Sequence, residues 1–312
     1  MIQTTCHRAA RGIARVILPL LLAGPAAGQQ AAAPLVLRLA GGTRALGFGN
    51  AYVAGRGPEV IFYNPAQIST APGMALSVER FAGASSLGAF SATTALGSAF
   101  AAGFGLQYLD YGATPGVFPT GPGSLGTRGP LDAASLAATA ALAVKWKGFR
   151  WGAAAEYLAE RVPADRGDGA AISLGAARDF GRFTLGLAAE HLGGHLTVAG
   201  AQADLPSRVT AGAVLQRYAI GTYFDVSASA AVSRERDGRI APAGGGELSY
   251  VPVEGWLFAL RAGARRVEDG PTPHLLPFTL GATAALDRFA LDYAFEAVRG
   301  GHAAHRIGVR IQ

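Results

Sequence analysis

The residues of this 312-residue chain that could do chemistry are few, and none is spaced like a known catalytic or metal centre. Two histidine pairs stand out, His191 with His195 and His302 with His305. On a helix such spacings would let two imidazoles share a metal ion. Here both pairs fall at the expected ends of strands or in loops. We therefore predict no metal site and no cofactor.

A hydrolase site would require a serine, a histidine and an acid that converge at one rim of the molecule. Ser229 and Asp110 are candidates, but nothing in the sequence ties them together, and Asp110 in "YLDYG" is better explained as the end of a strand. Signature motifs of serine hydrolases, zinc proteases and phosphate-binding loops do not occur. The segment "GFGNAY" lacks the third glycine of a dinucleotide fingerprint. The sequence predicts a protein that is not an enzyme, and a hydrolase is the weakest of three alternatives.

The remaining charged residues lie at alternate positions within apolar stretches. In "GWLFALRAGARR", Arg261 and Arg265 fall on the face opposite Trp256 and Phe258. The stretches "FALDYAFEAV" and "HRIGVRIQ" alternate in the same way, which is typical of strands with one apolar and one polar face. We interpret the polar face as the lumen of a barrel, with a charge network made of Arg261, Arg265, Asp292, Glu296, Arg306 and Arg310, and with Glu156 and Glu190 on the same side. Pairing in which residue numbers sum to 602 would set Glu296 opposite Arg306 and Asp292 opposite Arg310.

About fourteen such strand-like segments can be counted, and the links between them differ in length in a regular way. The segments begin near residues 74, 87, 97, 131, 149, 169, 182, 206, 219, 240, 255, 275, 288 and 304. Links such as "KG", "DFGR" and "DR" are short, whereas residues 110–130, 193–205, 234–239 and 267–274 form long loops rich in Gly, Pro and Asp. Short turns at one end and long loops at the other are typical of an outer-membrane barrel. The predicted fold is therefore an all-β, 14-strand antiparallel transmembrane β-barrel.

In this barrel one face of each strand meets lipid, and the sequence places aromatic residues there. The expected lipid-facing aromatic residues are Phe104, Tyr108, Trp151, Tyr157, Trp256, Phe258, Phe289 and Tyr293.

The composition agrees with a membrane barrel that lies outside the cytoplasm. Half of the residues are hydrophobic and 15% are charged, yet no apolar run reaches the ~18–20 residues of a membrane helix. Residues 1–28, with "VILPLLLAG" after three arginines, are typical of a secretory signal peptide and contain the only cysteine, Cys6. The net charge of +6 comes from scattered arginines, which together with export predicts no nucleic-acid partner.

The stretch "EVIFYNPAQIS" carries the signals of a short helix. Asn64 is a favourable N-cap, Pro65 suits the first helical position, and Gln67 stands where a capping box takes Glu or Gln.

The longer segment "GGTRALGFGNAYVAGRGPEVIFYNPAQIS" resembles the N-terminal segment of the PorV/PorQ family of outer-membrane proteins, which are short relatives of FadL-type fatty-acid transporters. The end of the chain, "PFTLGATAALDRFALDYAFEAVRGGHAAHRIGVRIQ", is similar to the closing hairpin of that family. The resemblance implies that residues 29–72 fold inward as a plug containing a short helix and that residues 73–312 form the barrel. The expected plug motif consists of Gly47, Gly49, Phe62, Tyr63, Asn64, Pro65 and Ala66.

Two functions follow as alternatives from the resemblance. The first is an accessory or scaffold in protein export to the cell surface, as in type IX secretion, with loops 110–130 and 193–205 holding secretion components or exported proteins. The second is a FadL-like passive channel for hydrophobic small molecules, in which the plug around Asn64 and Pro65 gates the lumen. A lumen filled by arginine–acid pairs favours the first, and a continuous apolar pocket favours the second. Both place the chain in the lipid of the outer membrane.

Overall fold

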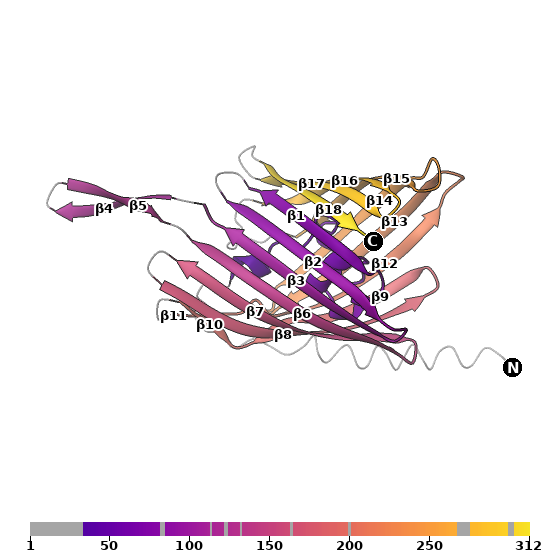
Figure 1. Cartoon of the computed structure of the whole chain (residues 1–312), viewed down its shortest axis with the longest axis horizontal. Helices are drawn as coiled ribbons and strands as arrows, with labels where there is room; N and C mark the ends of the chain where they lie inside the picture. The colour runs from indigo at the N-terminus through magenta and orange to yellow at the C-terminus, as the bar shows by residue number, and fades with distance from the viewer. Residues whose placement is uncertain are drawn as a thin grey trace.

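The structure is a computed structural model that describes residues 34–81, 85–112, 114–121, 124–131, 133–162, 165–198, 201–266, 275–298 and 303–312. Fourteen antiparallel strands close into one barrel (Figure 1), in the order β1-β18-β17-β16-β15-β14-β13-β12-β9-β8-β7-β6-β3-β2. The barrel strands are β1 (Gly73–Arg80), β2 (Ser86–Leu96), β3 (Phe100–Asp110), β6 (Ala134–Trp146), β7 (Phe149–Val162), β8 (Asp165–Phe180), β9 (Phe183–Gly193), β12 (Arg208–Ala219), β13 (Phe224–Glu235), β14 (Ile240–Tyr250), β15 (Trp256–Arg265), β16 (Leu275–Leu286), β17 (Phe289–Val298) and β18 (Ala303–Ile311). The predicted 14-strand barrel is confirmed, and each strand begins within five residues of its predicted start.

The alternating pattern of the sequence explains why the sheet closes. Large apolar side chains on the outer surface remain exposed in the isolated chain, among them Leu142 at 65% and Leu260 at 66%. The residues between them on the same strands point inward and are small, polar or charged. An outer surface of this kind is stable only against lipid, and closure leaves the sheet without edges. In the described part of the chain, no helix has the length and apolar character that crossing a membrane would require.

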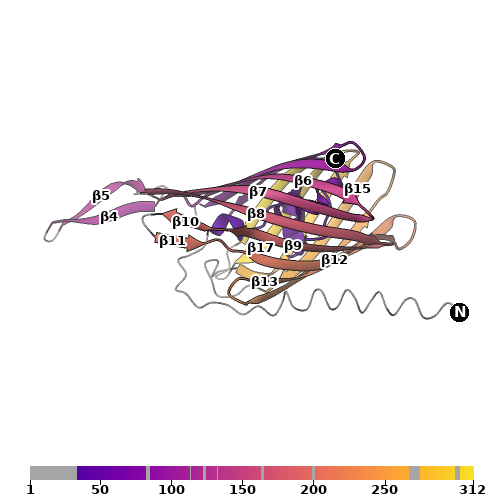
Figure 2. The same cartoon turned by 90° about the horizontal axis from the view of Figure 1, so that it is seen from below.

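The two ends of the barrel differ as predicted. Tight turns join β2 to β3, β6 to β7, β8 to β9 and β16 to β17, and both β1 and β18 have their outer termini at this short-turn end. The other end carries two extra hairpins, β4 (Thr114–Gly121) with β5 (Ser124–Leu131) and β10 (His195–Val198) with β11 (Ala201–Asp204). Figure 2 shows both hairpins at this end. The predicted loops 110–130 and 193–205 therefore contain strands.

Aromatic side chains gather on the outer surface near the short-turn end. Those exposed there include Phe100, Trp146, Trp151, Phe180, Phe183, Tyr218, Phe224, Tyr250, Trp256 and Phe289. All eight aromatic residues predicted to face lipid are exposed on the outer surface, from 39% for Tyr293 to 54% for Phe289. A belt of this kind marks the level of the lipid headgroups.

Inside the barrel lies the segment of residues 34–72, which we call the plug. It contains η2 (Leu35–Leu37), α2 (Thr43–Gly47), η3 (Pro58–Phe62) and η4 (Pro65–Ser69), coloured indigo and seen between the strands in Figures 1 and 2. The helix α2 packs against β15 to β18, whereas η3 packs against β1 to β3 and η4 against β6 to β8. The plug thus crosses the lumen from one wall to the opposite wall.

One predicted register is wrong. In the hairpin of β17 and β18 the paired residue numbers sum to 600, so Arg306 lies opposite Ala294 and Glu296 opposite Ala304. A shift by two residues keeps every side chain on its face, and all six residues of the predicted network remain on the lumen side. Because diagonal neighbours are only ~7–8 Å apart, long arginine side chains can still reach acids that are not directly opposite them.

Candidate functional site

The Asn64-Pro65-Ala66 step is seated against the inner wall formed by β7 and β8. Asn64 caps the 3-10 helix η4 by accepting a hydrogen bond from Ala66 N at 3.0 Å. Its amide nitrogen donates to Val53 O at 2.8 Å and lies 3.3 Å from Ala176 O, a carbonyl of the barrel wall. Asn64 is therefore both a helix cap and a link between the plug and the wall.

The predicted capping box is wrong. The Gln67 side chain does not return to the N-cap, because its amide donates to Ala54 O at 2.8 Å and its carbonyl accepts from Arg150 Nε at 2.9 Å. Arg150 in turn donates to Asp179 at 2.6 Å. Gln67 ties the plug to β7, a role that no local pattern could have revealed.

The aromatic residues before Asn64 hold together distant parts of the plug. The Tyr63 hydroxyl accepts from Gly41 N at 2.9 Å and donates to Asn50 Oδ1 at 2.5 Å. Its ring packs edge-on against Tyr52 with centroids 5.6 Å apart. Phe62 is half-buried against the same apolar cluster. Tyr63 thus joins the segment before Asn64 to earlier residues of the plug.

Gly47 and Gly49 bring the end of α2 close to the opposite wall. A Cβ on Gly49 would lie 2.6 Å from Ala264 O, and this residue has a φ of +65°, a conformation that favours glycine. Gly47 lies beside Gly281 of β16, where a Cβ on Gly281 would approach the Gly47 Cα to 3.2 Å.

Glycines on the wall meet the plug around most of the barrel. A Cβ added at Gly152 would lie 2.3 Å from Ala66 N, and one at Gly263 would lie 2.2 Å from Gly49 N. We call the following set the wall glycines: Gly103, Gly105, Gly152, Gly175, Gly186, Gly212, Gly245, Gly263, Gly281 and Gly308. They lie on nine of the fourteen strands. Because glycine has no side chain, the wall can approach the plug closely at each of these positions.

Charged side chains on β14 to β18 form one connected group with the plug. Glu247 accepts from Arg44 Nη2 at 3.1 Å and from Arg261 Nε. Arg310 Nε donates to Asp292 at 3.0 Å. All but Arg44 belong to barrel strands, so Arg44 is the residue by which α2 joins this network.

The rest of the network closes the barrel and holds the start of the plug. Arg265 pairs with Glu296, and Arg306 Nη1 lies 3.2 Å from Glu79, the residue directly opposite it across the seam between β1 and β18. The same nitrogen donates to Ala40 O of the plug at 2.5 Å. The predicted pairing of Glu296 with Arg306 does not form. Arg306 pairs with Glu79 on β1, its other neighbouring strand, and Glu296 pairs with Arg265 on β15, two strands away.

Glu59 is a buried acid of the plug. One carboxylate oxygen accepts from Thr43 N at 2.9 Å, and the other has no hydrogen-bond partner among the described residues. Burial raises the pKa of this carboxyl, which favours its neutral form.

The lumen at the long-loop end is apolar. We call the leucines there the leucine cluster, and each is at most 2% exposed: Leu87, Leu109, Leu158, Leu196 and Leu205. Val36 and Leu37 of the plug pack into this cluster. The hydrogen bond from Gln107 to Val36 O is long, at 3.5 Å. The start of the plug is thus held mainly by apolar contacts.

The remaining candidates of the sequence do not come together. Ser229 on β13 donates to Ala51 O of the plug, whereas Asp110 at the end of β3 accepts from Gly112 N at 2.8 Å. His191 pairs with the buried Glu156 at 2.6 Å and His195 with Asp204 at 2.6 Å, while His302 lies outside the described residues. Among the described residues, no group of three or more His, Cys, Asp or Glu side chains could hold a metal ion.

Sequence reasoning missed the wall glycines and the leucine cluster. The glycines were visible at inward positions of several strands, but nothing local shows which of them meet the plug. The leucines are far apart in the sequence, on three barrel strands, on β10 and in the link after β11, and they become a cluster only in the folded chain.

Comparison with known proteins supports the fold. No protein-family model matches this sequence, and no curated protein matches it. The toluene transporter TbuX of Ralstonia pickettii has a similar structure, with a TM-score of 0.53 at 14% identity over 88% of this chain and 98% of that one. The toluene transporter TodX of P. putida gives 0.53 at 13% identity over 85% and 96%. A FadL homologue of Pseudomonas aeruginosa gives 0.50 at 13% identity over 92% and 98%. At such identities the likeness shows the fold alone, and it does not extend to the PorV/PorQ family.

Proposed function

We propose that this chain is a passive outer-membrane channel for hydrophobic small molecules. The observation that carries the proposal is the leucine cluster at the long-loop end of the lumen, which is filled by Val36 and Leu37 of the chain itself. A concave apolar surface of this kind is what a small apolar ligand binds. The solved structures of similar fold include two toluene transporters, so we take toluene as the first compound to test.

The channel would open when a ligand takes the place of Val36 and Leu37 in the leucine cluster. The hydrogen bond from Arg306 to Ala40 O fixes the chain at Ala40, and residues 35–39 precede this point in the sequence. An apolar ligand that enters the leucine cluster replaces the contacts of Val36 and Leu37 with similar ones, so the two states differ little in buried apolar area. Such an exchange needs no external energy source.

Uptake of labelled toluene by intact cells tests the proposal. Cells that carry the protein should take up toluene faster than matched cells without it. Replacing Leu109 and Leu158 with Asn should lower the rate, because buried amides without partners disfavour an apolar ligand. Replacing both with Met is the matched control, because it keeps the surface apolar, and uptake should be retained. Equal uptake with and without correctly assembled protein would contradict the proposal.

A role in surface export is the second candidate, favoured by two observations. Arginine–acid pairs occupy the lumen beside β14 to β18, which is the arrangement expected for this role. The hairpin of β4 and β5 extends well beyond the barrel end (Figure 1), where it could contact another protein. Removing residues 114–131 should then abolish export of a surface protein while toluene uptake continues. If export is unchanged, the hairpin serves some other purpose.

A further inference from the structure

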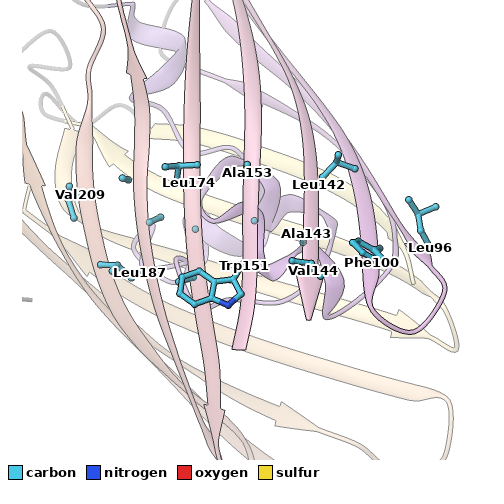
Figure 3. A pocket seen from close by; sticks show the side chains of 15 residues that line it. Leu96, Phe100, Leu142, Ala143, Val144, Trp151, Ala153, Leu174, Leu187 and Val209 are labelled. Atoms are coloured by element: carbon cyan, nitrogen blue, oxygen red, sulfur yellow. The ribbon is translucent and has the colours of Figure 1, made fainter. Parts of the chain in front are cut away.

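A groove lies on the lipid-facing side of the wall, across β3, β6, β7, β8 and β9, with a volume of about 810 Å³. Figure 3 shows Leu142, Leu174, Leu187 and Trp151 standing around it. Between these large side chains the lining is small, with Ala143, Gly152, Ala153, Gly175, Ala176 and Ala188. The groove is thus a hollow within an outer surface that elsewhere carries large side chains.

The plug seals the floor of this groove from inside. Gly152 and Gly175 line the groove, and the Asn64-Pro65-Ala66 step lies directly behind them. A Cβ at Gly152 would lie 2.3 Å from Pro65 C, so no space remains between the wall and the plug. Whatever occupies the groove therefore arrives from the membrane and not from the lumen.

Cationic side chains stand at the short-turn end of the groove. Arg178 follows Leu174 and Ala176 on the outer face of β8, and its guanidinium carbon lies 4.7 Å from the Phe149 ring centroid. The Phe149 ring is 5.7 Å from that of Trp151, which lines the groove. In the neighbouring turn, Lys147 Nζ lies 4.6 Å from the Trp146 ring. The positive charges therefore stand at the level of the aromatic belt.

No carboxylate neutralises these cations in the described part of the chain. Arg178, Lys147 and Arg182 rest on aromatic rings and take part in none of the ion pairs that the described residues form. The one acid beside them, Asp179, is bound by Arg150 at 2.6 Å. Lys145 and Lys147, the only lysines of the chain, both lie in this region. The groove end is positively charged without internal compensation.

A second groove on the opposite side has no such charge pattern. It lies on β13 to β17, measures about 600 Å³ and is lined by Tyr250, Phe258 and Leu260. The turns at its end carry Glu254 and Asp287 as well as Arg288. The two grooves share an apolar, aromatic character and differ in charge.

We propose that the groove over β6 to β9 binds an anionic phospholipid of the periplasmic leaflet. Its phosphate would lie between Arg178 and Lys147, and an acyl chain would fill the hollow above the small residues. Short turns face the periplasm in barrels of this kind. Each Lys or Arg near an anionic headgroup strengthens lipid binding by about 1 kcal/mol, which is about a factor of five in the binding constant. The second groove, with its mixed charges, binds lipid without this preference. The site is independent of what the lumen transports.

Quenching of single tryptophans by brominated lipids tests this site. The full barrel is placed in phosphatidylcholine bilayers that contain either brominated phosphatidylglycerol or additional brominated phosphatidylcholine at equal bromine content. Trp146→Phe with Trp256→Phe leaves Trp151 as the reporter of the first groove. Trp146→Phe with Trp151→Phe leaves Trp256 as the reporter of the second groove. The measured quantity is the ratio of quenching by brominated phosphatidylglycerol to quenching by brominated phosphatidylcholine. This ratio should be about five or more for Trp151 and near one for Trp256.

Charge removal completes the test. Arg178→Gln with Lys147→Gln should bring the Trp151 ratio close to one, whereas the matched change Arg288→Gln at the other side should leave it unchanged. Heat-dependent migration of the barrel in gels verifies that each variant is folded. A ratio near one for Trp151 in the unaltered site would overturn the proposal. So would an equal preference at Trp256, which would indicate attraction to the whole surface, or a preference that survives the double substitution.

Discussion

Glycines fit both lumen walls closely to the plug, the wall formed by β14 to β18 and the wall formed by β2 to β9, but the two walls differ in what else holds it. The first adds an ion pair and a hydrogen bond made by arginines, whereas the second adds most of the leucine cluster and the bond from Arg150 to Gln67. On the first wall, Arg44 reaches Glu247, and Arg306 reaches Ala40 O. On the second, Val36 and Leu37 of the plug pack against leucines such as Leu109 and Leu158. Ion pairs have specific partners that a small apolar molecule cannot replace, but apolar contacts can be exchanged for a ligand. Under the proposed exchange, the chain at Ala40 would act as an anchor, and Val36 and Leu37 would move.

The largest expected effect comes from breaking the anchor. Arg306→Met leaves the Glu79 carboxylate buried and unpaired and removes the donor to Ala40 O, which should lower the free energy of unfolding by about 3–5 kcal/mol. Urea unfolding of the barrel in lipid vesicles measures the change. The double variant Arg306→Met with Glu79→Met removes both charges and should recover most of the loss. If it recovers none, the charged wall does not act through this pair.

A smaller effect is expected from the shape of the apolar wall. Gly152→Ala places a methyl group against the Ala66 backbone, and overpacking of this kind costs about 1–3 kcal/mol. The control is Gly246→Ala on β14, where the nearest atom to an added Cβ lies 3.8 Å away. Proteolysis within residues 34–72 should increase only for Gly152→Ala, because there the plug is displaced. Equal behaviour of both variants would mean that the wall glycines do not seat the plug.

The smallest effect concerns Asn64, which makes polar contacts within the plug and also lies 3.3 Å from Ala176 O on the second wall. Asn64→Ala removes the cap of η4 and the bond to Val53 O, at a cost of about 0.5–2 kcal/mol. Ser69→Ala in the same helix, whose hydroxyl bond to Ala66 O is 3.4 Å long, is the matched control and should be nearly neutral. Uptake of small dyes by intact cells should rise for Asn64→Ala. A cost as large as that of Arg306→Met would show that the two walls are held alike.

The sequence by itself determined the barrel, because strands with one apolar face are joined by links that are short at one end and long at the other, a combination typical of a membrane barrel. The strand starts, the outward aromatic residues and the lumen position of Arg261, Asp292 and Arg310 followed from alternation. The short-turn end followed from the lengths of the links between strands. The cap formed by Asn64 also followed, because capping depends on residues that are neighbours in the chain.

Only the tertiary structure decided which residues meet. Arg306 pairs with Glu79 because the barrel closes β18 against β1, two strands at opposite ends of the sequence. Gln67 reaches Arg150 and not its own helix cap, since the plug lies against β7. The wall glycines and the leucine cluster are residues far apart in the sequence that lie on many different elements. Contacts between residues far apart in the chain depend on how the sheet closes and how the plug enters it, and no local pattern encodes either.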